Sequence, residues 1–261
     1  MAQIRRPSVA GMFYPGDKEK LSAAVRSYLA DAEPSGPTPA AIIAPHAGYI
    51  YSGPIAARAY ARLSPLRGKI ERVVLIGPAH RLPFRGLALS GADEFETPLG
   101  RTPIDVDAIE AISRLPQVKR LDAAFDGEHC LEVHLPFLQT VLGAVKLVPI
   151  VVGDASGADV AEILEMLWTG PETLPVISSD LSHYHDYATA RRRDKETSRT
   201  IEAMAGERLD WDDACGRIPI AGLLTVAKKR GLHATTIDLR NSGDTAGSRG
   251  EVVGYGAWVV A

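Results

Sequence analysis

The sequence is poor in cysteine and carries no excess of either charge. Only two cysteines, Cys130 and Cys215, occur among 261 residues, so a secreted fold held together by disulfide bonds is not indicated. The 29 Lys and Arg residues are balanced by 32 Asp and Glu residues, and the formal net charge is -3. Because no basic tail or stripe is present, we expect no binding to nucleic acid.

Long apolar segments are also missing. Residues 1–7 lack the apolar stretch of a signal peptide, and charges or prolines interrupt every apolar run before it reaches membrane-spanning length. We therefore expect a cytoplasmic protein that makes no membrane contact.

Apolar residues are nevertheless plentiful. They make up 46% of the chain, which is enough for a sizeable core without disulfide staples. The length fits one large α/β domain or two small ones, and we expect a single domain over residues 1–261.

Short apolar runs alternate with amphipathic segments along the chain. The runs predict core strands at residues 40–44, 71–77, 147–152 and 174–178, and closing strands at 235–239 and 252–260. Helices are expected at residues 54–63, from about 107, from 128, and at 160–168, 189–204 and 219–229, and a turn region at 95–100. This alternation predicts a layered α/β sandwich with a mostly parallel or mixed central sheet.

Polar side chains follow three of the predicted core strands. His46, His80 and the pair Asp180 and His183 stand just past strand ends, and the carboxyl ends of parallel strands meet at one edge of a sheet. Cys215 precedes a predicted helix, where a thiolate is favoured. Imidazole, thiolate and carboxylate groups are ligands of Fe, Zn and Cu, so a metal site is one interpretation. The alternatives are hydrogen-bonded loop histidines, an apolar role for Cys215 and a helix cap at Asp180.

The segment from residue 128 is harder to interpret. We expect one of its histidines, His129 or His134, to line the site from the side, and Cys130 to be buried. Glu128 and Glu132 are expected to face solvent. Two further histidines, His185 and His233, are interpreted as structural or surface residues.

Several short motifs, found in order along nearly the whole chain, resemble the Memo family. They extend from about Arg6 to Tyr255 and comprise Pro45-His46-Ala47-Gly48-Tyr49 with Ser52-Gly53, Gly77-Pro78-Ala79-His80, Thr97-Pro98-Leu99, Glu128-His129, Glu132-Val133-His134-Leu135-Pro136, Ser178-Ser179-Asp180 with His183, and Cys215-Gly216-Arg217 with Pro219-Ile220. Each motif is short, but together they are specific. Prokaryotic members of this family are called AmmeMemoRadiSam system protein B.

The resemblance implies a fold similar to that of the class III extradiol ring-cleaving dioxygenases. The family's metal positions fall on His46, His80 and Cys215, with Asp180 and His183 beside them. The third ligand is then a thiolate instead of the glutamate that those dioxygenases use, which favours softer metals. One ion is implied, Fe(II) or Cu, with Zn as a further alternative. A radical SAM protein and an AMMECR-type protein are the implied partners.

Two functions of different classes follow. The first is a metal-dependent redox enzyme that acts on a small oxygenated or catechol-like substrate, with His183 as general acid/base, Asp180 as the residue that orients it, and Tyr49, Tyr51 and His134 lining the pocket. The second is a non-catalytic binding or adaptor protein on a dioxygenase-like scaffold. Metal-assisted hydrolysis ranks last, because the sequence has no nucleophile elbow or paired carboxylates.

Overall fold

Four apolar runs form adjacent parallel strands at the centre of the sheet. The computed structural model describes residues 2–32 and 35–261. The central strands, in spatial order, are β2 (Ala41–Ala44), β9 (Thr173–Ser178), β3 (Arg72–Pro78) and β8 (Lys146–Val152). All three pairings between them are parallel, and nearly every residue is buried, as in a sheet covered on both faces.

Antiparallel strands extend this parallel centre on both sides. Beyond β2 lies β12 (Val252–Val260), which also pairs with β10 (His183–His185) and β11 (Ala234–Asn241). Beyond β8 lie β4 (Leu87–Leu89), antiparallel to β8, and β7 (Val118–Arg120), parallel to β4. The predicted α/β fold with a mixed central sheet is therefore confirmed.

A second, small sheet consists of β1 (Ile4–Arg5), β5 (Glu94–Thr97) and β6 (Gly100–Pro103). The prediction of an irregular turn region over residues 95–100 is wrong for most of that stretch. The chain forms a hairpin in which β5 and β6 are antiparallel, and its tight turn is closed by Gly100, whose φ of 141° suits glycine.

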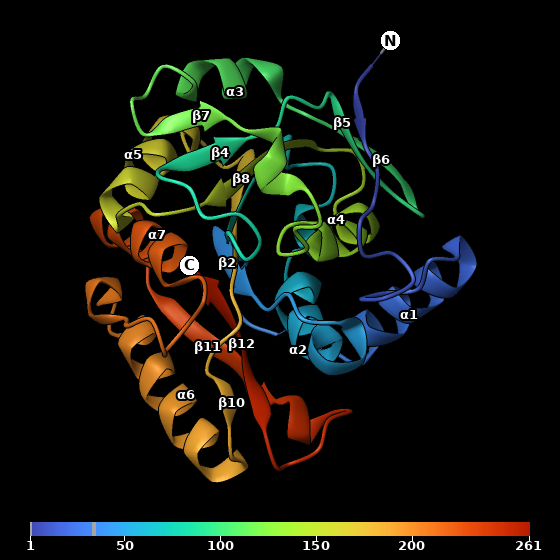
Figure 1. Ribbon diagram of the computed structural model, residues 1–261, viewed down its shortest axis with the longest axis vertical. Helices are drawn as coiled ribbons and strands as arrows, with labels where there is room; N and C mark the ends of the chain where they lie inside the picture. The colour runs from blue at the N-terminus through green and yellow to red at the C-terminus, as the bar shows by residue number, and fades with distance from the viewer. Residues whose placement is uncertain (1, 33–34) are drawn as a thin grey trace.

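Helices cover both faces of the large sheet. In the described residues the α-helices are α1 (Lys18–Ala30), α2 (Tyr49–Ala61), α3 (Val106–Ile112), α4 (Leu135–Val141), α5 (Gly157–Leu167), α6 (Tyr187–Glu202) and α7 (Arg217–Lys229). Single 3-10 turns are found at Ser64–Leu66, Asp122–Phe125, Glu132–His134, Gly206–Arg208 and Ser242–Asp244. Figure 1 shows α1, α2 and α4 on one side of the strands, with α5 and α7 on the other.

The start of α2 differs from the sequence prediction. A helix beginning at Pro54 was expected, but α2 begins at Tyr49 and contains Pro54 in its interior. Its first turn closes when the backbone N–H of Ser52 donates to the carbonyl oxygen of Gly48. Only the bond that a Pro54 N–H would make is lost, so the helix tolerates the ring near its start. The residues after His46 are therefore helical, which turns Tyr49 inward.

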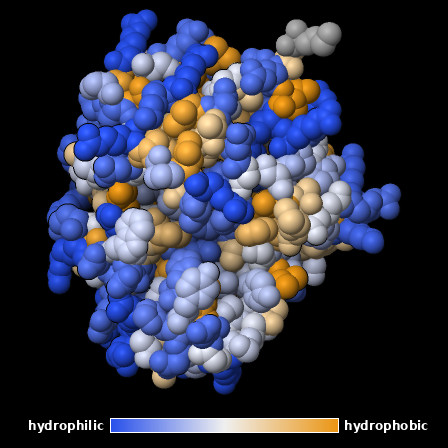
Figure 2. Space-filling view, viewed as in Figure 1, coloured by the Kyte–Doolittle hydropathy of each residue, from blue (hydrophilic) through white to orange (hydrophobic). Residues whose placement is uncertain are grey.

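The outer surface is mostly polar. Figure 2 shows charged and polar side chains over most of one face, with apolar side chains scattered among them in small groups. Within the described residues, no helix is long and apolar enough to cross a membrane.

Candidate metal centre

The parallel strands bring three sequence-distant groups to one edge of the sheet. His46 follows β2, His80 follows β3, and Cys215 lies in the loop before α7. The rings of His46 and His80 have centroids 5.0 Å apart, and Cys215 Sγ lies 3.4 Å from His46 Nε2. One ligand atom from each of the three residues lies within 4.8 Å of the other two.

The hydrogen bonds of His46 fix its tautomer. Its Nδ1 lies 2.6 Å from Ser178 Oγ, and that hydroxyl donates its one hydrogen to the carbonyl oxygen of Cys130. Ser178 must then accept from His46, so the imidazole proton is on Nδ1 and the lone pair of Nε2 is free. Burial, followed by the neighbouring imidazoles, lowers the pKa of His46 well below its usual range. The ring is neutral at pH 7, which is the form that binds metals.

His80 is held in the same tautomer by Glu128. His80 Nδ1 lies 3.0 Å from Glu128 Oε1, and its backbone N–H donates to Oε2 at 2.7 Å. A carboxylate only accepts, so His80 carries its proton on Nδ1 and presents Nε2. Burial acts to raise the pKa of Glu128, but the hydrogen bond and charge of His80 outweigh it, and the pKa falls to about 2. The expectation that Glu128 faces solvent is wrong, because its carboxylate is buried beside His80.

Cys215 is held by the backbone that follows β9. Its sulfur accepts from the backbone N–H of Asp180 at 3.3 Å, and its own N–H donates to the Asp180 carbonyl oxygen. The next residue, Gly216, lies so close to Ser179 that an added Cβ would stand 2.5 Å from the Ser179 Cβ, so glycine permits this approach. Burial, followed by the charge of Asp180, raises the pKa of the Cys215 thiol. The expected effect of the helix N-terminus is outweighed by burial.

Asp180 supports His46 and not His183. Its Oδ1 accepts from the backbone N–H of His46 at 2.8 Å, and no hydrogen bond joins it to His183 in the described part of the chain. Asp180 leaves β9 beside β2, whereas His183 lies on β10, so the expected orienting role of Asp180 toward His183 stays a prediction. Burial raises the pKa of Asp180 to about 7, against the opposing hydrogen bond from His46.

His183 lines a cavity that opens beside His80 and Cys215. Burial lowers the pKa of His183, so its imidazole is neutral at pH 7 and can accept a proton. His185, interpreted from the sequence as a structural or surface residue, is half-buried and lies on the same cavity wall. His183 and His185 both lie on β10. The pairing of this strand with β12 is irregular between the two residues, where Tyr184 adopts a φ of 60°.

The segment from residue 128 contributes His129 instead of His134. The ring of His129 lies 4.8 Å from that of His80 and 5.5 Å from that of His46, centroid to centroid. Burial lowers its pKa to about 4 despite the charge of Glu128. His134 is buried behind the site, with Nδ1 2.7 Å from the hydroxyl of Tyr60. Cys130 is buried, as expected, with 0% of its surface exposed.

The two tyrosines after His46 also lie away from the cavity. Tyr49 is buried, donates its hydroxyl hydrogen to the carbonyl oxygen of Val133 at 2.7 Å, and packs against the ring of Phe137. Tyr51 is half-buried. Neither tyrosine, nor His134, is among the described residues that line the cavity, so the substrate contacts expected for these three are not present in this conformation.

The donor set fits one transition-metal ion. Tetrahedral Zn–N and Zn–S bonds of roughly 2.0 and 2.3 Å place neighbouring nitrogen and sulfur ligands about 3.5 Å apart. The separation of 3.4 Å between His46 Nε2 and Cys215 Sγ meets this requirement. Both imidazoles are aimed by acceptors on Nδ1, which is the usual arrangement of metal-binding histidines. A bound cation would also lower the cost of a thiolate at Cys215.

The cavity beside these donors has a volume of about 850 Å³. Its wall includes His80, Cys215 and His183, so a small molecule inside it would reach the donor group. This size is typical of small-molecule sites.

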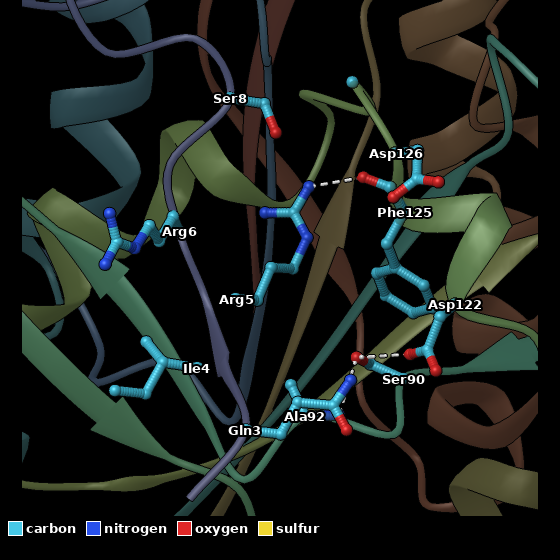
Figure 3. Close-up of a pocket in the computed structure, with 11 residues that line it drawn as sticks. Gln3, Ile4, Arg5, Arg6, Ser8, Ser90, Ala92, Asp122, Phe125 and Asp126 are labelled. Carbon is cyan, nitrogen blue, oxygen red and sulfur yellow. Dashed lines mark hydrogen bonds between the residues drawn. The ribbon is translucent and has the colours of Figure 1, made fainter.

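A smaller hollow of about 310 Å³ lies elsewhere, beneath the N-terminal strand, and is lined by side chains of both charges. Figure 3 shows Arg5 crossing it from β1 toward the segment at Phe125, while Ser90 and Asp122 form a hydrogen bond on the opposite wall. Arg5 Nη2 donates to the carbonyl oxygens of Phe125 and Glu128, at 2.6 and 3.0 Å. Through these two hydrogen bonds, Arg5 holds the segment that carries Glu128; we call this contact the Arg5 clamp.

Glu132 completes this clamp. Its buried carboxylate forms an ion pair with Arg5 at 3.2 Å. It also accepts from the backbone N–H groups of Ser8 and Val9, at 2.7 and 2.9 Å, and from the hydroxyl of Tyr14 at 2.7 Å. The expectation that Glu132 faces solvent is wrong, because this one carboxylate fastens the N-terminal segment to the wall behind the metal centre.

Comparisons with known proteins point to one family. The family model described as Memo-like protein matches residues 5–259. The chain is 36% identical over 265 residues to a MEMO1 family protein of Aquifex aeolicus, with 97% of each chain covered. It is 31% identical over 272 residues to a MEMO1 family protein of Nitrosopumilus maritimus, covering 97% of this chain and 98% of that one. Among solved structures, uncharacterized protein JW3007 from Escherichia coli K12 is similar, with a TM-score of 0.48, 12% identity, and coverage of 82% of this chain and 98% of that chain.

Proposed function

The chain belongs to the Memo-like family, and on that premise we propose that it is a metal-dependent redox enzyme. It binds one ion through His46, His80 and Cys215 and acts on a small oxygenated or catechol-like molecule. One observation carries the proposal. Acceptors on both Nδ1 atoms leave the Nε2 lone pairs of His46 and His80 free in a group with Cys215, and two of these three residues, His80 and Cys215, line an open cavity.

The ion is Fe(II) or Cu, with Zn as the further alternative. Two imidazoles and a thiolate are softer than the carboxylate-containing set of a typical Fe(II) oxygenase, which favours Cu(I), Zn or sulfur-ligated iron over a hard Fe(II) site. The bound ion supplies Lewis acidity and, for iron or copper, a one-electron couple.

The chain's own residues bind, position and move protons. His183 is a neutral imidazole on the cavity wall and serves as the general base that takes a proton from a substrate hydroxyl. Asp180 holds the backbone of His46 and the sulfur of Cys215, which keeps both donors in place. The apolar part of the wall limits water around the reacting group.

Metal analysis of purified variants tests the site. Wild-type protein is expected to hold about one ion per chain, and His46→Ala and Cys215→Ser are expected to lose it. His233→Ala is the matched control, because His233 bonds to Ala261 at the opposite edge of the sheet. Full occupancy in the first two variants rules out this ligand set.

Oxygen uptake tests the reaction. Protein reconstituted anaerobically with Fe(II) is assayed on a panel of catechols. Uptake that requires both substrate and His183 supports the enzyme. Absence of turnover together with capture of a protein partner supports the adaptor function instead, for which exposed Trp211 and Tyr184 offer contact surface. The radical SAM and AMMECR-type partners and the cytoplasmic location stay predictions.

A further inference from the structure

The cavity beside the metal centre has a mostly apolar wall. Besides His80, Cys215 and the histidines of β10, its lining includes the apolar side chains of Pro78, Leu82, Phe84, Val152, Ile218 and Pro219. Burial of a ring or a short hydrocarbon against such a wall is favourable, in proportion to the area removed from water. The wall therefore favours a substrate with an apolar body.

Some of the charged side chains that line the cavity form ion pairs with other protein groups and some do not. Arg85 is almost fully exposed and lies 3.8 Å from the carboxylate of Asp154. The carboxylate of Asp212 lies 3.8 Å from Arg193. In contrast, Arg217 forms no ion pair within residues 2–32 and 35–261, and its Nε is buried without a hydrogen-bond partner. Arg81 also lines the cavity and also has no ion partner among the described residues, but it is exposed. Arg217 is therefore the half-buried cation of this lining that lacks an ion pair in the described part of the chain.

Arg217 is well placed to meet a substrate. It is the first residue of α7, two positions after Cys215, and both line the same cavity. Its guanidinium carbon lies 5.2 Å from the centre of the Trp211 ring, which limits the directions that the side chain can take. The positive end of the α7 dipole adds to the same field. The Arg217 guanidinium, the Cys215 thiol and the apolar wall therefore line the same cavity.

A planar guanidinium matches a carboxylate, because two parallel N–H groups can donate to its two oxygens. We propose that the substrate is an aromatic or similarly compact apolar carboxylic acid, whose carboxylate binds Arg217 while its body packs on the apolar wall. Arg217 is then a specificity residue of the site. The inference rests on the proposed function in one respect: it takes the cavity next to the metal donors as the substrate site.

Titration with benzoate tests the proposal, with benzamide as its uncharged counterpart of nearly the same shape. Trp211 reports binding, because it is 73% exposed while Trp168 and Trp258 are buried. Benzoate is expected to shift the tryptophan emission of the wild type and not of Trp211→Phe. Ligand-observed NMR measures the affinity independently of that signal. Benzoate is expected to bind more tightly than benzamide by about tenfold or more, as expected for a charged hydrogen-bonded pair.

Variants locate the carboxylate. Arg217→Gln is expected to weaken benzoate binding by about tenfold or more and to leave benzamide binding unchanged. The benzoate affinity of Arg217→Lys is expected to lie between those of the wild type and Arg217→Gln, because lysine keeps the positive charge but lacks the two parallel N–H donors of the guanidinium. Arg85→Gln is the matched control for the same change of charge at the same cavity, and is expected to stay within about twofold of the wild type because Arg85 is exposed.

Four results would overturn the proposal. The first is equal affinity for benzoate and benzamide. The second is a loss of benzoate binding in Arg81→Gln or Arg85→Gln but not in Arg217→Gln. The third is phenyl phosphate binding more than tenfold tighter than benzoate, which assigns the site to phosphate.

Metal content is measured on the same samples. A loss of metal in Arg217→Gln assigns the residue to the metal site and also overturns the proposal, whereas metal retained in His46→Ala contradicts the proposed function alone.

Discussion

Glu128 supports His80 at the candidate metal centre through two contacts: Nδ1 of the histidine lies 3.0 Å from Oε1 of the buried carboxylate, and the other oxygen accepts from the His80 backbone. Forty-eight positions separate the two residues in sequence. The pair fixes which nitrogen of His80 carries the proton, and so which one faces Cys215.

Substitution of Glu128 tests this support. Glu128→Gln can place an amide N–H opposite His80 Nδ1, so the tautomer is no longer fixed. Metal affinity is expected to fall by about 10- to 100-fold, the usual effect of losing an outer partner of a metal-bound histidine. Competition titration against a chromophoric chelator measures the affinity. Glu207→Gln, an exposed glutamate on a 3-10 turn, is the control. Unchanged affinity in Glu128→Gln would show that the ion does not depend on this contact.

Substitution of Ser178 tests the corresponding support of His46. Ser178→Ala removes the acceptor for His46 Nδ1 and the donor to the Cys130 carbonyl oxygen. Metal affinity is expected to fall about tenfold. The free energy of unfolding of the metal-free protein is expected to fall by about 1–3 kcal/mol, because two buried polar atoms lose their partner. Urea denaturation and the same chelator competition provide both values, and a variant that loses stability but keeps full affinity would separate Ser178 from the metal site.

Asp194 predicts a pH dependence of stability that is separate from the metal. Burial raises its folded-state pKa from the usual 3.8 to about 6, although the backbone N–H of Ser182 donates to it. For an acid with a raised pKa, the stabilising contribution is fully present below the unfolded pKa and is lost as pH rises through the folded one.

The measurement compares wild type with Asp194→Asn in metal-free form between pH 4 and pH 7. The wild type is expected to lose stability relative to the variant by about 3 kcal/mol over this range, from a shift of about two pKa units. The substitution can also change the free energy of unfolding by an amount that is the same at every pH, and such a change does not affect the pH dependence of the difference between the two proteins. A difference between the two proteins that stays flat with pH is incompatible with the raised pKa.

Glu132 predicts how firmly the N-terminal segment is attached. Glu132→Ala leaves the Arg5 guanidinium without its carboxylate and removes the acceptor of Ser8, Val9 and Tyr14. The free energy of unfolding is expected to fall by about 3–5 kcal/mol, as for one partner of a buried ion pair. Trypsin is expected to cleave after Arg5 faster than in the wild type, because Pro7 protects the bond after Arg6. A loss below about 1 kcal/mol with unchanged proteolysis would mean that the clamp contributes little.

The sequence predicted the sheet and the histidines at its edge because both follow from local pattern. Buried parallel strands appear as continuous apolar runs, so the ends of β2 and β3 could be located and His46 and His80 placed at one edge. Cys215 needed the family resemblance, since nothing in its local pattern shows that the loop before α7 reaches that edge.

The remaining differences depend on tertiary contacts. The segment that carries Glu128 and His129 is fastened by Arg5 of the N-terminal strand, through contacts that span 120 and 123 positions in sequence. Tyr49 was expected to line the pocket, and the helix was expected to begin at Pro54. In the structure that tyrosine starts the helix and turns into the core.

X-ray absorption at the metal edge reads out the proposed ligand set itself. In protein loaded with its metal, we expect one sulfur at about 2.3 Å and two imidazole nitrogens at about 2.0–2.1 Å, distances typical of such ligands. The sulfur contribution is expected to disappear in Cys215→Ser. A spectrum with only nitrogen and oxygen neighbours in the wild type would contradict the assignment of Cys215, and with it the site formed by His46, His80 and Cys215.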